Sequence, residues 1–238
     1  MKQLIDEFRD LLRTVSPLMV TLMVLSVVGM NLLANKSINT GVEWLALDCG
    51  ILLSWLTFLS MDVLTQCYGP RAATMLSVGA LLLNLMMALV FFVASHIPGV
   101  WGESFVDGSE SIINTALDNT FGGTWFIILG SSIAFLVSSV VNNFLNYGIG
   151  KALNREVSFG TFAIRAYVST FIGQFTDNLV FALLVSRIFF GWTMIQCLTC
   201  ALTGALMELL FEIFFSPIGY RISRGILDGR AVPELQKA

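Results

Sequence analysis

Six stretches of about twenty or more predominantly apolar residues recur along this chain, and they limit its possible folds more than any other feature. An α-helix needs about twenty apolar residues to cross the roughly 30 Å hydrocarbon core of a bilayer. Because unpaired backbone groups are costly in hydrocarbon, successive spanning helices are the simplest fold for such a chain. The stretches cover residues 17–35, 44–67, 72–95, 124–153, 162–189 and 192–216. The sequence therefore predicts an all-α integral membrane bundle of six transmembrane helices.

The composition supports a membrane environment. Of the 238 residues, 56% are hydrophobic and only 12% are charged, whereas a soluble domain has about 25% charged residues. We expect an amphipathic surface segment at 1–16 and the six-helix transporter domain at 17–220, followed by a basic tail at 221–238. Within the domain, an acidic outer loop covers about 97–123 and includes a short helix at 109–117.

The distribution of lysine and arginine predicts the orientation. With six spans, both termini and the second and fourth loops lie on one side, which then carries eleven of the 13 basic residues, Arg165 among them. The other side has Lys36 and Arg187. Because basic loops stay in the cytoplasm, we expect a multi-pass protein of the cell (inner) membrane with both termini cytoplasmic and the acidic loop outside.

Ionisable side chains inside membrane spans are costly and are therefore candidates for function. The first group is Asp62 and Gln66, four residues apart on one helical face, followed by Tyr68, Gly69 and Arg71. Its structural alternative is an interfacial Asp62 that pairs with Arg71.

A second group, Gln174, Asp177 and Asn178, shares one face near the middle of the fifth span. A lone carboxylate there needs a donor, a proton or a polar ligand. The alternative is a hydrogen-bonding hub between helices.

The third group is Glu208 and Glu212, one turn apart in the sixth span, with Pro217 just beyond its predicted end. Two carboxylates on one face repel each other, so we expect one of them to be protonated or matched by a cation. Solvation at the membrane interface is an alternative for Glu212.

Asparagines occur in several other spans and complete the set of candidates. They are Asn31, Asn84, Asn142, Asn143 and Asn146. Individually such residues often link helices, but polar side chains on at least four helices favour a polar ligand between them.

Other classes of chemistry lack a sequence signal. The pair Cys197 and Cys200 has no second Cys or His pair, and His96 is the only histidine. We find no HExxH, GxSxG or GxxxxGK[ST] motif, so we expect no metal, no cofactor and no enzyme, and any use of ATP requires a partner.

Three segments together resemble the queuosine precursor transporter family, also called the vitamin uptake transporter family. They are MDVLTQCYGPRAA at 61–73, STFIGQFTDNLVF at 169–181 and FFSPIGY at 214–220. The resemblance covers about residues 17–224. It implies a fold similar to the substrate-binding subunits of energy-coupling-factor transporters, and uptake of a 7-deazaguanine base, queuine or its nucleoside. The residues that match the family pattern are Asp62, Tyr68, Gly69, Arg71, Gln174, Asp177 and Pro217.

The chain also departs from that pattern. Gln66 stands where an acidic residue is common, and Ser139 and Asn142 stand where a glutamine and an aspartate are frequent. Glu208 lies near a frequent lysine, and the added carboxylate favours a cationic ligand.

A planar base needs flat walls, for which Trp55, Trp125, Phe175 and Phe181 are candidates. The expected partners are a small-molecule substrate and membrane lipid, with no nucleic acid. A homodimer, and a binding subunit that needs an energising partner complex, remain open alternatives.

Overall fold

The computed structural model describes residues 2–34, 36–38, 42, 47–101, 108, 110–122, 125–153, 158–189 and 191–230. Most of them are helical. The helices are α1 (Lys2–Thr14), α2 (Pro17–Leu33), α3 (Ile51–Tyr68), α4 (Pro70–His96), α5 (Glu110–Gly122), α6 (Trp125–Ala152), α7 (Phe159–Phe181), α8 (Arg187–Phe189) and α9 (Met194–Arg230). A π-helical turn, η1 (Ala182–Ser186), joins α7 to α8, and β1 (Ser37–Ile38) pairs antiparallel with β2 (Leu47–Asp48).

Five helical segments in the described part of the chain are long and apolar enough to cross a membrane. They are Ile51–Tyr68, Pro70–His96, Ile128–Ala152, Phe159–Ser186 and Met194–Gly229. Helix α2 adds a sixth if it is counted together with α1, from which it is bent by 112°. The prediction of a multi-pass helical membrane protein is confirmed, with five or six spans.

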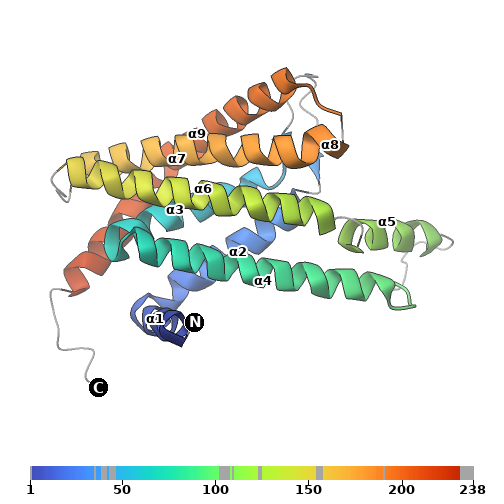
Figure 1. The fold of residues 1–238 in the computed structure, drawn as a ribbon, viewed down its shortest axis with the longest axis horizontal. Helices are drawn as coiled ribbons and strands as arrows, with labels where there is room; N and C mark the ends of the chain where they lie inside the picture. The colour runs from blue at the N-terminus through green and yellow to red at the C-terminus, as the bar shows by residue number, and fades with distance from the viewer. Residues whose placement is uncertain are drawn as a thin grey trace.

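The long helices lie side by side and pass back and forth between two ends of the bundle (Figure 1). At one end, here called the α1 end, lie α1, the turn from α3 to α4, the end of α6, the start of α7 and the last turns of α9. The opposite end, called the α5 end, holds α5 and α8. Helix α9 packs against α3, α7 and η1, and α6 packs against α3, α4 and α7.

The turn from α3 to α4 depends on Gly69. Its backbone angles of φ 87° and ψ 164° lie in a region that only glycine occupies readily. Pro70 then begins α4, where its missing N–H costs nothing. This sharp reversal brings α4 alongside α3.

Helix α1 is attached to this turn. The Arg71 guanidinium forms an ion pair with Glu7 at 2.6 Å, and the Tyr68 hydroxyl donates to the Thr14 carbonyl at 3.3 Å. Arg71 therefore pairs with α1, so the alternative in which it neutralises Asp62 is wrong.

Two predicted helix ends differ from the structure. The second span begins at Ile51 rather than at residue 44, since Leu47–Asp48 form a strand; residues 43–46 lie outside the described part. The last helix continues through Pro217 to Arg230 instead of ending at Ser216.

Side-chain hydrogen bonds allow α9 to continue past Pro217. Because proline has no N–H, the Ile213 carbonyl loses its usual helical partner. The Ser216 hydroxyl donates to this carbonyl at 3.1 Å, and the Tyr167 hydroxyl of α7 lies 2.8 Å from the Ser216 oxygen. Such local donors can satisfy a carbonyl that proline frees within a transmembrane helix.

Candidate functional site

Buried polar side chains gather where α3, α6, α7 and α9 meet. Four ionisable residues of the described chain are buried there: Asp62 and Glu212 at 0% exposure, Glu208 at 5% and Arg165 at 6%. Three carboxyl groups thus face a single guanidinium inside an apolar bundle. Each of these groups requires a hydrogen-bonding or charged partner, because burial of an unpaired charge is costly.

Asp62 is fully hydrogen-bonded by side chains of two other helices. Its Oδ1 accepts from Asn142 Nδ2 and Asn146 Nδ2, both at 2.9 Å, and from Ser169 Oγ at 3.2 Å. Its Oδ2 accepts from Thr170 Oγ1 at 3.1 Å. Four donors thus reach Asp62, three at Oδ1 and one at Oδ2, so Asp62 serves to hold α3, α6 and α7 together.

Arg165 belongs to the same network. Its Nε donates to the Asn146 carbonyl at 3.2 Å, and its Nη2 donates to Asn146 Oδ1 at 2.8 Å. A Cβ at Gly150 would lie 2.5 Å from the guanidinium carbon, so the glycine leaves room for Arg165. Asn146 therefore connects Arg165 to Asp62. Arg165, which was counted among the basic residues of one side, is buried within α7, which begins at Phe159.

Glu208 is held from two sides. The Ser54 hydroxyl of α3 donates to its Oε1, and Gln174 Nε2 of α7 donates to its Oε2 at 2.6 Å. The structure thus brings together Gln174 and Glu208, which the sequence placed in separate groups. A hydroxyl and an amide from two different helices thus fix the positions of both Glu208 oxygens.

Glu212 has different surroundings. Neither of its carboxyl oxygens has a hydrogen-bond partner among the described residues. It lies one turn from Glu208 and within electrostatic reach of both Glu208 and Asp62. Because the side chain is buried inside the bundle, solvation at the membrane interface does not explain it.

Asp177 and Asn178 lie near the point where α7 becomes η1, and both are half-buried. The Ser138 hydroxyl of α6 donates to Asp177 Oδ1 at 2.7 Å. Asn178 Nδ2 has no hydrogen-bond partner within the described chain. A Cβ at Gly204 would lie 2.7 Å from this nitrogen, so α9 approaches Asn178 closely there.

Two predicted asparagines link helices. Asn31 Nδ2 donates to the Val27 carbonyl at 2.8 Å, and its Oδ1 accepts from the Ser131 hydroxyl of α6. Asn143 accepts from Thr65 of α3 and donates to Thr74 of α4, each at 3.1 Å. Both amides thus form hydrogen bonds between helices, which is the alternative to a ligand-binding role for these asparagines.

The remaining predicted residues occupy distinct places. Gln66 is half-buried near the end of α3, while Tyr68, Gly69 and Arg71 form the turn that attaches α1. Pro217 lies within α9.

Sequence reasoning left out several residues that position the carboxyl groups. They are Ser54, Ser169 and Thr170, whose hydroxyls complete the networks around Glu208 and Asp62. Of these three, only Thr170 has a signal in the sequence, because it lies four residues before Gln174 on the same helical face. The other two have none, because hydroxyl side chains are common in apolar spans. Within the described residues, no three His, Cys, Asp or Glu side chains are placed to hold a metal ion.

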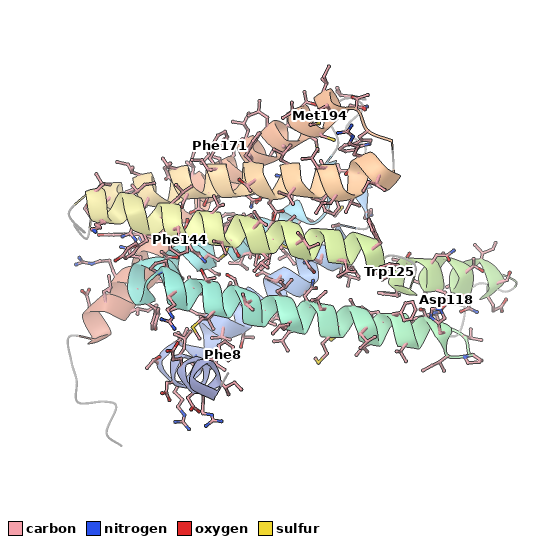
Figure 2. The ribbon with its side chains drawn as sticks, in the orientation of Figure 1. Phe8, Asp118, Trp125, Phe144, Phe171 and Met194 are labelled. Carbon is pink, nitrogen blue, oxygen red and sulfur yellow. The ribbon has the colours of Figure 1, made fainter. Side chains whose placement is uncertain are left out.

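Only some of the aromatic side chains predicted to stack on a planar base lie near this site. Trp55 of α3 stacks on Phe215 of α9, with ring centroids 3.9 Å apart and planes 13° apart. Trp125 is 53% exposed at the α5 end (Figure 2). Phe175 and Phe181 are half-buried.

A cavity of about 250 Å³ lies at the α5 end, away from the buried carboxyl groups. Phe92, His96, Asp118 and Trp125 are among the residues that line it. Figure 2 shows Asp118 and Trp125 in this region. Asp118 already accepts from the Trp101 indole N–H at 2.5 Å.

The fold defines a multi-pass membrane protein with carboxyl groups buried at its centre. A family model described as "Putative vitamin uptake transporter" matches residues 48–222, about three quarters of the chain. The chain belongs to this family of transporters for vitamin-like substrates. The match runs from the start of α3 into α9 and includes all of the predicted site residues except Asn31. Comparisons with curated proteins and with solved structures found no match.

Proposed function

We propose that this transporter takes up a queuosine precursor: a 7-deazaguanine base, queuine or its nucleoside. One observation carries the proposal. Glu208 is buried in an apolar bundle, where Ser54 and Gln174 hold its two oxygens in a fixed position. A carboxylate fixed in this way is a suitable acceptor for the adjacent N–H donors of a guanine-like edge, which can bind it in parallel.

Nearby groups suit the rest of such a ligand. Asn178 Nδ2 has no partner among the described residues and can donate to the base carbonyl. The stacked pair Trp55 and Phe215 provides an aromatic surface between α3 and α9. Three buried carboxyl groups against Arg165 leave an excess of negative charge. This excess favours precursors with a protonated amine, such as 7-aminomethyl-7-deazaguanine or queuine, over the neutral 7-cyano base.

The distribution of basic residues supports an orientation in the membrane, and this orientation gives the proposed route of the substrate. The eleven basic residues assigned to one side of the membrane support cytoplasmic termini and a location in the cell (inner) membrane. In that orientation the α1 end faces the cytoplasm, and the cavity at the α5 end faces the exterior. Substrate then enters at the α5 end and leaves at the α1 end, by alternating exposure of the centre between the helices. The reaction is transport rather than chemical conversion.

Calorimetric binding to the purified protein in detergent tests this proposal. We expect 7-aminomethyl-7-deazaguanine and queuine to bind more tightly than the 7-cyano base. Glu208→Gln should weaken binding of the amine-bearing ligands at least tenfold, because charge-assisted hydrogen bonds are worth about 1.5–3 kcal/mol. The matched control is Glu110→Gln, which changes an exposed residue on α5. Equal affinity of Glu208→Gln and the unchanged protein would contradict the assignment.

A further inference from the structure

Glu212 is the buried acidic group that the proposed binding site does not use. Its side chain has 0% exposure, and both oxygens lack a hydrogen-bond partner in the part of the chain that the structure describes. By contrast, Asp62 accepts from four side chains and Glu208 from two. The three groups thus share one centre but differ sharply in how their oxygens are satisfied.

The groups around Glu212 do not neutralise a negative charge on it. From α3 it meets the carboxylate Asp62, and on α9 itself it meets Glu208. Helix α7 contributes Arg165, whose guanidinium donates twice to Asn146. A third negative charge beside these two carboxylates, with no donor among the described residues to solvate it, is highly unfavourable in a dry interior.

The other titratable groups near α9 have partners of their own. On α7, the Tyr167 hydroxyl bonds with Ser216, and Asp177 accepts from Ser138. The π-helical turn η1, which also packs against α9, carries no titratable side chain. Among the described residues, no protein donor is therefore left as a partner for Glu212.

We infer that Glu212 is a proton-binding site and that its proton is the ion that drives transport. The neutral acid removes the repulsion from Asp62 and Glu208. With Glu212 neutral, Asp62 is balanced by Arg165, and Glu208 alone keeps a negative charge for a cationic substrate. The occupied centre then has no net charge. The transport role rests on the proposed function, whereas the presence of the proton does not.

The local structure of α9 gives the proton a path. Glu212 is followed directly by Ile213, whose carbonyl lacks its helical N–H partner because of Pro217 and is held by Ser216 instead. A helix with such a replaced bond bends there more easily than elsewhere. Bending exposes Glu212 to water on one side, where a proton leaves its carboxyl oxygen, and a proton from the other side rejoins it in the next cycle. No other bond is made or broken.

Infrared spectroscopy tests the proton without any substrate. The protonated protein should show the C=O stretch of a carboxylic acid, and this band should disappear in Glu212→Gln. It should persist in Glu208→Gln, the matched change one turn away. Glutamine has nearly the shape of a neutral glutamic acid, so Glu212→Gln should fold and elute as the unchanged protein does. Absence of the band, or its loss in Glu208→Gln alone, would overturn the inference.

Transport in proteoliposomes tests the coupling. With 7-aminomethyl-7-deazaguanine as the probe, Glu212→Gln should keep binding and exchange within about twofold of the unchanged protein. Accumulation driven by a pH gradient should fall to equal concentrations on both sides. Loss of binding in Glu212→Gln would instead make Glu212 a ligand for the substrate amine. Accumulation that follows a sodium gradient alone would also reject the proton. If the unchanged protein binds none of the precursors, the proposed function fails, and the infrared band still decides whether Glu212 holds a proton.

Discussion

Asp62 and Glu212 are both fully buried acids on neighbouring helices, yet their surroundings are opposite. Asp62 accepts hydrogen bonds from four side chains, while Glu212 accepts none from the described residues. The difference separates a structural role from a functional one. A buried carboxylate with a complete set of donors joins helices, whereas one without donors must take its partner from solution.

The structural role of Asp62 predicts a large effect on stability. Asp62→Ala leaves the amides of Asn142 and Asn146 without their acceptor, so we expect the free energy of unfolding to fall by about 2–4 kcal/mol. Unfolding of the detergent-solubilised protein measures this change. The control, Arg71→Ala, removes an ion pair in which the arginine side chain is 76% exposed, and its cost should stay below about 1 kcal/mol. Equal losses for the two variants would contradict the role of Asp62.

Residue spacing predicts which polar groups lie inside, but it does not predict their partners. Asp62, Gln174, Glu208 and Glu212 were all identified from their positions in apolar stretches, and all are buried. Asp177 is only half-buried although it lies far from the predicted ends of its span. Depth within a helix fixes distance from the headgroups, whereas burial depends on which neighbouring helix covers that face.

At the level of elements, the turn from α3 to α4 requires a glycine. A Cβ at Gly69 would meet no atom within 4 Å, so the requirement is purely one of backbone conformation. We expect Gly69→Ala to lower the free energy of unfolding by about 1–3 kcal/mol.

Gly148 in α6 provides the matched control for Gly69. Its Cβ position is also open, but it lies within a regular helix, where alanine stabilises by about 0.5–1 kcal/mol. Unfolding of both variants in the same detergent should therefore give changes of opposite sign. The account of the turn fails if Gly69→Ala is as stable as Gly148→Ala.

The apolar stretches predicted the long helices well, and the errors have specific causes. Proline usually signals a helix end, but Ser216 and Tyr167 supply the hydrogen bonds that let α9 continue past Pro217. The predicted start of the second span was too early because Leu47–Asp48 pair with Ser37–Ile38 in a short sheet. Both features depend on contacts with distant segments, which hydropathy does not record.

For the whole molecule, the basic residues at one end of the bundle and the acids in its centre both fit a transporter. Two of the described basic residues, Arg71 and Lys151, occur at the start of α4 and the end of α6, which both lie at the α1 end of the bundle. The acids Glu208 and Glu212 lie between α3, α7 and α9 inside it, and Glu212 has no hydrogen-bond partner among the described residues. Charge at one end orients such a bundle, and charge in its centre attracts a polar ligand. The number of membrane spans could be predicted from the sequence to within one, but the grouping of the three acids required the fold.

Uptake by the purified chain alone is the most direct test of this account. Proteoliposomes that contain only this protein, without ATP, should take up 7-aminomethyl-7-deazaguanine or queuine at a rate that saturates as the substrate concentration rises. Liposomes with Glu208→Gln should lose most of this uptake. Ligand binding without any uptake would contradict the account, because the chain would then be a binding subunit that depends on an energising partner.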